Sequence, residues 1–188
     1  MIAAAARSFF DVGYEATAIE QVAADAGVSK VTVYNHFGDK RSLFGAAVEY
    51  ECERMRGLFE MRPASSGSLV DRLTVIGEAM SAFLSRPELV RFDRRVAAET
   101  EHDPEIGRAF LNAGPHRMKG AFAGLLESLV EAGELEIDDC AIAAEQFVSM
   151  VKGMGDLERR FGMERNEEVD RARIEGAVEV FLAAYAAA

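Results

Sequence analysis

The sequence contains only two cysteines in 188 residues, Cys52 and Cys140, and they lie far apart. Cysteines of this number and spacing provide neither a disulfide framework nor a cysteine-based metal site. An uncharged apolar run long enough to cross a bilayer is also missing, as is a signal-peptide pattern at the start. We therefore expect a cytoplasmic protein in a reducing compartment, with no membrane among its partners.

Positive charge is scarce as well. The chain has 21 Lys and Arg against 32 Asp and Glu, which gives a net charge of -11. A phosphate backbone repels such a chain, so indiscriminate nucleic-acid binding is excluded unless positive charge is concentrated locally. Residues 1–50 come nearest to that condition, because they contain four basic residues against six acidic ones.

Strand-like alternation is absent too, and apolar residues recur instead at three- and four-residue spacing. Helix starts are well marked. Thr17 and Glu20 form a predicted capping box, and Pro87, Pro104 and Pro115 each suit the first position of a helix. The sequence therefore predicts an all-α protein of about nine or ten helices.

The stretch GVSKVTVYNHFGDK, residues 27–40, predicts a short helix after a tight turn. Gly27 ends the preceding helix, and Ser29 can cap the new one. Val33 and Phe37, four residues apart, point inward. The opposite face carries Val31, Thr32 and Asn35. Such a pair is typical of a helix-turn-helix, whose second helix enters the DNA major groove; an ordinary pair of surface helices is the alternative.

Residues 5–48, AARSFFDVGYEATAIEQVAADAGVSKVTVYNHFGDKRSLFGAAV, resemble the DNA-binding domain of TetR-family transcriptional regulators. The specific parts are residues 13–14, 19–23, 26–30 and 34–37. The resemblance implies an all-α fold in which an N-terminal three-helix helix-turn-helix DNA-binding domain, residues 1–47, precedes a larger helical ligand-binding and dimerisation domain, residues 48–188. The middle of the chain is similar to members related to multidrug-efflux repressors.

The same resemblance implies a function. We expect a ligand-responsive transcriptional regulator, usually a repressor, that binds double-stranded DNA at a palindromic operator as a homodimer. A small, largely apolar effector would release it, and neither a cofactor nor catalytic activity is implied.

The DNA-contacting positions of the family can be carried over residue by residue. They fall on Thr17, Ser29, Lys30, Val31, Thr32, Tyr34, Asn35, His36 and Lys40. Hydroxyls at helix N-termini suit phosphates, and Asn can pair with adenine. Two features depart from the family pattern. Residue 31 is often Gly in the family, and members usually carry a basic stretch before the first helix. Either the sequence is shortened at this end, or its DNA affinity lacks that arm.

The C-terminal domain implied by the resemblance supplies a dimer interface and a ligand pocket. For the interface we expect Phe147, Met150, Gly153, Met154, Val178, Phe181, Leu182 and Tyr185. For the pocket we expect Met80, Phe83, Phe92, Phe110, Met118, Phe122, Phe147 and Met150. Charged residues of the middle segment, Arg91, Arg94, Arg95, Glu99 and Arg108, are expected mostly on a solvated face, with pairing to an anionic ligand group as the alternative.

Two alternatives belong to other functional classes. Glu99 and His102 give half of the Glu-x-x-His pair that a di-iron helical bundle requires, and neither His36 nor His116 supplies the other half. A single divalent ion bound by His102, Asp103 or His116 is a weaker version of the metal interpretation. The second alternative is a helix-turn-helix protein that acts mainly through protein interactions, which predicts no operator preference.

Overall fold

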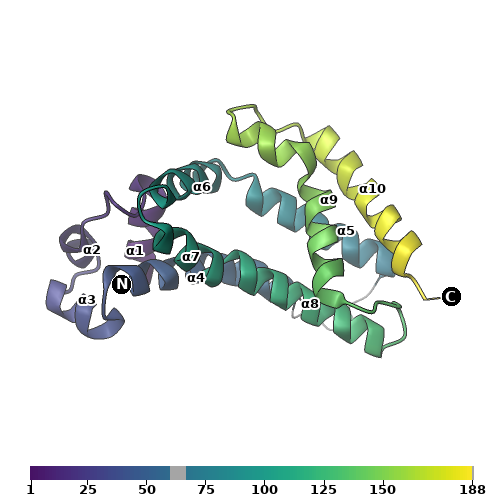
Figure 1. Cartoon of the computed structure of the whole chain (residues 1–188), viewed down its shortest axis with the longest axis horizontal. Coiled ribbons are helices and arrows are strands. Elements are labelled where there is room, and N and C mark those ends of the chain that lie inside the picture. Colours follow the sequence, from purple (N-terminus) through teal and green to yellow (C-terminus); the bar gives the residue numbers. More distant parts are fainter. Residues whose placement is uncertain (60–66, 188) are drawn as a thin grey trace. The chain divides into compact units, whose positions relative to one another are not determined.

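The computed structural model describes residues 1–59 and 67–187, which form ten α-helices and no strand (Figure 1). The helices are α1 (Ile2–Val12), α2 (Ile19–Asp25), α3 (Lys30–Phe37), α4 (Lys40–Phe59), α5 (Leu69–Leu84), α6 (Pro87–Thr100), α7 (Pro104–Ala113), α8 (Pro115–Glu131), α9 (Cys140–Arg160) and α10 (Glu167–Tyr185). The all-α prediction is confirmed, and the three prolines do open α6, α7 and α8. No helix in the described ranges is both long and apolar enough to span a membrane.

The chain packs into two units. Unit 1 comprises Met1–Glu53 and Pro87–Arg117, and unit 2 comprises Arg54–Arg86 and Met118–Ala188. Unit 1 therefore joins the first three helices to α6 and α7, which follow them by several tens of residues in the sequence. The functional boundary predicted after residue 47 is a separate matter and stays a prediction.

Aromatic rings fill the core of unit 1. Phe10 stacks on Phe92 with ring centroids 4.0 Å apart, and Phe9 meets Phe44 edge-on at 5.2 Å. Phe110 lies edge-on to Phe92 at 5.7 Å. Phe92 is fully buried by these contacts. Phe92, predicted to line the ligand pocket, packs here against Phe10 and Phe110 in the core of unit 1, and its pocket role stays a prediction.

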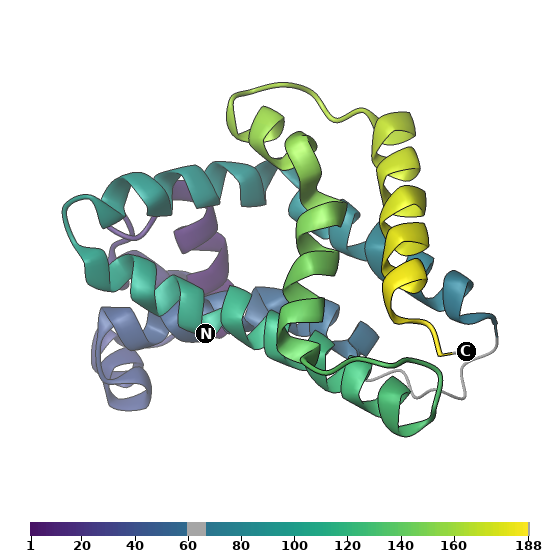
Figure 2. The same ribbon diagram turned by 45° about the vertical axis from the view of Figure 1, so that its right-hand side comes forward.

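The core of unit 2 lies among α5, α8, α9 and α10. Figures 1 and 2 show α9 and α10 running side by side, and α5 contacts both. Phe147 meets Phe122 at 5.2 Å and Phe181 at 5.3 Å between ring centroids. Phe147, Val178 and Phe181 are each at most 2% exposed within one chain. These three residues are core residues and not surface residues of an interface, which corrects that part of the prediction.

Helix α9 is broken at Gly153, whose backbone is non-helical at φ +45° and ψ -154°. A Cβ atom at this position would stand 2.6 Å from Cδ of Arg173 on α10. The backbone conformation and the close approach both require glycine. Arg173 thus passes across the break and reaches Asp170.

Asp170 is buried and lies at the centre of an ion cluster. Its carboxylate accepts from Nη1 of Arg173 at 2.6 Å and from Nε of Arg165 at 2.9 Å. Arg159, itself almost fully buried, lies 3.5 Å away. Burial by itself raises the pKa of Asp170, but the guanidinium groups outweigh it and hold that pKa below its usual range. The cluster fixes the connection between α9 and α10.

Candidate nucleic-acid interface

The helix-turn-helix is built as the local sequence dictates. Helix α2 buries Ile19 and Val22, and the chain turns at Gly27 with φ +67°. Ser29 then caps α3, because its Oγ accepts from the backbone N–H of Thr32 at 3.0 Å. The predicted cap and the predicted turn are both confirmed.

The faces of α3 are divided as the spacing predicted. Val33 is 1% exposed and anchors the helix, whereas Val31 is 65% exposed. Thr32, Asn35 and His36 are exposed together with Tyr34. The Asn35 amide makes no side-chain hydrogen bond to any residue that the structure describes, so both its donor and its acceptor are available to a base edge.

Lys30, at the start of α3, pairs with Glu20 of α2. The hydrogen bond from Lys30 lowers the pKa of Glu20, and the hydrogen bond to Glu20 raises the pKa of Lys30. Both side chains are well exposed, and the ammonium group lies 5.6 Å from the Tyr34 ring centroid. Because this ion pair is exposed, the Lys30 ammonium could exchange its contact with Glu20 for a contact with a DNA phosphate.

Lys40, the first residue of α4, is held more closely. Its Nζ donates to the backbone carbonyl of Glu15 at 3.0 Å and lies 4.8 Å from the Tyr14 ring centroid. Desolvation lowers the pKa of Lys40, opposed by the charges of Glu99 and Glu15. The adjacent Arg41 pairs with Asp103 at 3.1 Å. Lys30 and Lys40 are thus the cations best placed near α3.

Thr17 does not act as predicted. Its side chain is buried, and its Oγ1 donates to the carbonyl of Gly13 at 2.7 Å. The N-cap of α2 is Ala18, which offers no side-chain cap. The predicted capping box of Thr17 and Glu20 is wrong, because the threonine hydroxyl bonds back to the preceding turn. A phosphate would have to meet this helix end through backbone amides.

Two charged residues of α6 that we expected on a solvated face instead contact the end of α1 and the turn that follows it. The carboxylate of Glu99 accepts from the backbone N–H groups of Tyr14 and Glu15, and Arg95 donates to the carbonyls of Phe10 and Asp11. No local pattern predicts these contacts, because the partners lie about 85 residues away along the chain.

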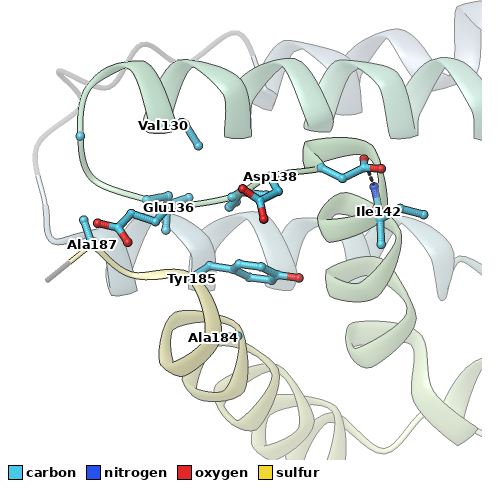
Figure 3. A pocket seen from close by; sticks show the side chains of 11 residues that line it. Val130, Glu136, Asp138, Ile142, Ala184, Tyr185 and Ala187 are labelled. Atoms are coloured by element: carbon cyan, nitrogen blue, oxygen red, sulfur yellow. Dashed lines mark hydrogen bonds between the residues drawn. The ribbon is translucent and has the colours of Figure 1, made fainter.

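An open cleft of about 770 Å³ lies in unit 2, between the loop after α8 and the end of α10 (Figure 3). It is lined by Val130, Gly133, Leu135, Glu136, Ile137, Asp138, Asp139, Ile142, Ala184, Tyr185 and Ala187. Asp139 accepts from the backbone N–H of Ile142 at 3.0 Å and so caps α9. An antiparallel bridge between Leu135, which lines the cleft, and Ala186 joins the loop after α8 to the end of the described chain.

The cleft does not coincide with the predicted ligand pocket. Met80, Phe122 and Phe147 lie in the core of unit 2 and do not line the cleft, and their pocket role stays a prediction. The partly buried residues packed against that core include Phe83, Met118 and Met150. Phe110 packs on Phe92 in unit 1, as described above.

Apolar residues remain exposed on α9 and α10 and between them. Met154 is exposed, as are Leu157, Val169 and Val180, and Phe161 is 78% exposed. Of the predicted interface, Gly153 and Met154 are exposed, and Met150, Leu182 and Tyr185 are half-buried. On α10 the exposed small or apolar residues Val169, Ala172, Val180 and Ala183 recur on one face.

Two of the residues considered for a metal ion, Asp103 and His116, have other partners. Asp103 caps α7, accepting from the N–H of Glu105 at 3.0 Å, and also pairs with Arg41. His116 Nδ1 lies 3.1 Å from Asn112 Oδ1. Among residues 1–59 and 67–187, no three His, Cys, Asp or Glu side chains are grouped so that they could hold a metal ion.

Two family models match the chain. Residues 1–47 match the model described as "Bacterial regulatory proteins, tetR family". Residues 71–187 match the model described as "AefR-like transcriptional repressor, C-terminal domain". The second match alone covers more than half of the chain.

Individual proteins agree with the family models. The HTH-type transcriptional regulator YezE of Bacillus subtilis (strain 168) is 27% identical over 139 residues, which are 72% of this chain and 71% of YezE. The crystal structure of a TetR-family regulator from Mesorhizobium loti MAFF303099 superposes with a TM-score of 0.81 at 28% identity, covering 98% of this chain and 94% of that one. The flavonoid-responsive regulator FrrA gives 0.75 at 31% identity with the same coverage.

Proposed function

Because this chain belongs to the TetR family of bacterial transcriptional regulators, we propose that it represses transcription as a homodimer bound to a palindromic operator. A small, largely apolar ligand would release it, and its place of action would be the cytoplasm. The observation that carries the proposal is the exposed face of α3. This face carries side chains that can contact bases and phosphates, on a helix anchored by the buried Val33.

We assign base contacts to the exposed face of α3 and phosphate contacts to its edges. Asn35 suits an adenine, and the methyl groups of Val31 and Thr32 suit a thymine methyl. Phosphate contacts go to Ser29, Lys30, Tyr34, His36 and Lys40, which position the helix without specifying a sequence.

The homodimer is supported by the exposed apolar residues of α9 and α10. Val180 is 58% exposed on the same helix whose opposite face is buried in unit 2. An apolar helix face of this kind is a candidate for contact with a second copy of the chain. A twofold dimer would also place two α3 helices for the two halves of a palindrome.

One observation supports the class of ligand and another supports its size. FrrA, 31% identical to this chain, is described as flavonoid-responsive, and a flavonoid is a small aromatic compound. The cleft of unit 2 has a volume within the range of about 300–1,000 Å³ that small ligands occupy.

Selection of binding sites from random DNA with the purified chain tests the proposal. We expect an inverted repeat whose half-sites lie about 34–36 Å apart, or a multiple of one helical turn. Recovery of no repeat, with equal binding to all sequences, would instead favour a helix-turn-helix protein that acts through protein partners.

A further inference from the structure

We propose that Arg95 and Glu99 of α6 are positioning residues for DNA binding, although both lie outside the helix-turn-helix segment. They hold the turn after α1, and through it Lys40, in the place from which Lys40 contacts a phosphate. The inference rests on the proposed function, because it assumes that α3 and Lys40 meet an operator.

Glu99 caps the turn that follows α1. Its Oε2 accepts from the backbone N–H of Tyr14 at 3.0 Å, and its Oε1 accepts from that of Glu15 at 3.1 Å. Gly13 precedes these amides with φ +93°, and a Cβ atom there would stand 2.6 Å from Glu99 Oε1. The missing side chain lets the carboxylate come close enough to satisfy both donors, and hydrogen bonds to a charged acceptor are among the stronger ones.

Arg95 satisfies the complementary backbone groups one turn earlier on α6. The last carbonyls of a helix have no partner within it. Nη1 of Arg95 donates to the carbonyl of Phe10 at 3.3 Å and to that of Asp11. A cation at this end of α1 also suits the negative end of the helix dipole. Arg95 and Glu99, both half-buried, therefore bind the end of α1 and the start of the next turn together.

The turn after α1, which Glu99 restrains, also holds Lys40. The carbonyl of Glu15 accepts from Lys40 Nζ at 3.0 Å, and the Tyr14 ring lies under the same ammonium. Residues 14 and 15 thus donate to Glu99 on one side and hold Lys40 on the other. A displaced turn would displace the ammonium group, and a phosphate contact tolerates only hydrogen-bond distances.

A third charged side chain contacts the same segment. Asp103 lies beyond the end of α6, where it caps α7, and it pairs with Arg41, next to Lys40, at 3.1 Å. Arg95 and Glu99, four residues apart, share one face of α6, which packs against α1. The N-terminal segment is therefore contacted by two charged side chains of α6 and one at the start of α7.

The sign of the charge effect separates positioning from simple electrostatics. Glu99 is an acid in unit 1, which also contains α3, so removal of its negative charge alone should strengthen DNA binding. Loss of positioning should weaken it. A purely structural role would lower thermal stability without changing the number of phosphates that the folded protein contacts.

The test compares Glu99→Gln and Glu99→Asp with the matched control Glu101→Gln, an exposed acid on the neighbouring turn. Gln removes the charge and one of the two acceptors, whereas Asp keeps the charge but is too short to reach both amides. Operator affinity is measured over a series of salt concentrations, at a temperature where circular dichroism shows every variant folded. Amide hydrogen exchange reports the turn directly.

We expect both Glu99 variants to bind the operator about a hundredfold more weakly, because the dimer loses two charged hydrogen bonds to phosphate, each worth about tenfold in affinity. Their log-log salt slope should fall by about 2, because one phosphate contact is lost in each subunit. The amides of Tyr14 and Glu15 should exchange faster, and Glu101→Gln should bind as tightly as wild type or more tightly.

Wild-type or tighter operator binding by Glu99→Gln, with an unchanged salt slope, would overturn the inference while the proposed function stands. A wild-type protein that prefers no operator would overturn the proposed function and this inference with it. Unchanged exchange at Tyr14 and Glu15 in both Glu99 variants would show that Glu99 does not hold the turn, and would also overturn the inference.

Discussion

Replacing Lys30 by Gln should change how strongly DNA binding depends on salt. We assign the phosphate contacts near α3 to Lys30, which begins that helix, and to Lys40, which begins α4. In the free protein Lys30 pairs with Glu20, and Arg41 pairs with Asp103 at 3.1 Å. Each lysine that neutralises a phosphate releases condensed counterions, and this release sets the slope of log K against log salt concentration.

The expected magnitude follows from that count. Two lysines per subunit give four phosphate contacts per dimer, so the wild-type slope should be about -3.6, or -0.9 for each contact. Lys30→Gln leaves two contacts per dimer and a slope of about -1.8. Between 50 and 200 mM salt, wild-type affinity should therefore fall by about 150-fold, and that of the variant by only about twelvefold.

Fluorescence anisotropy with a labelled operator duplex measures both slopes. Lys119→Gln is the matched control, since it removes the same charge from a lysine of unit 2 that pairs with Glu145. A Lys30→Gln protein with weaker binding but a wild-type slope would refute the reasoning, because Lys30 would then contact no phosphate. A wild-type slope much steeper than about -5 would show that other cations take part.

Three further predictions concern other parts of the molecule. In binding assays, Asn35→Ala should cost about 1–3 kcal/mol on the best site and little elsewhere, whereas Tyr34→Phe should weaken all sequences alike. Asp170→Asn should destabilise the fold by about 3 kcal/mol and lower the melting temperature by about 6–12 °C. The folded state holds the pKa of Asp170 below its usual range, so the carboxylate contributes fully to the free energy of unfolding above that range. This contribution is lost as the pH falls below about 4, and the difference in melting temperature between wild type and variant should shrink there. Val180→Glu should shift the protein toward monomer in sedimentation without unfolding it, while Val75→Glu, a similarly exposed change on α5, should leave it dimeric.

Spacing within one helix predicted which residues of α3 are buried and which are exposed. Val33 and Val31 lie on opposite faces of α3 because residues two apart on a helix cannot share a face, and this needs no tertiary information. The cap at Ser29 followed from the same local rules. The capping-box prediction for Thr17 is wrong because its hydroxyl donates to the carbonyl of Gly13, a competing acceptor that the capping-box pattern does not reveal.

Contacts between distant segments could not be predicted in this way. Periodicity marks Phe147 and Phe181 as apolar, but a helix that is apolar on most sides does not show which side faces its own core and which a partner. Arg95 and Glu99 are ordinary surface residues by composition. Their partners are backbone groups at the end of α1 and in the turn after it, and a backbone group is not encoded by a particular residue type.

Because of the break in α9, we expect substitutions at residues 153 and 173 to be correlated during evolution. A side chain at residue 153 would need a different backbone path, since φ is +45° there, and a displaced Arg173, whose Cδ lies 2.6 Å from where a Cβ would stand. A new backbone path at residue 153 without a displaced Arg173, or the reverse, would leave a steric clash or backbone strain. Among descendants of this sequence the two positions should therefore be replaced together or not at all, and a straight α9 should accompany a shorter residue at position 173.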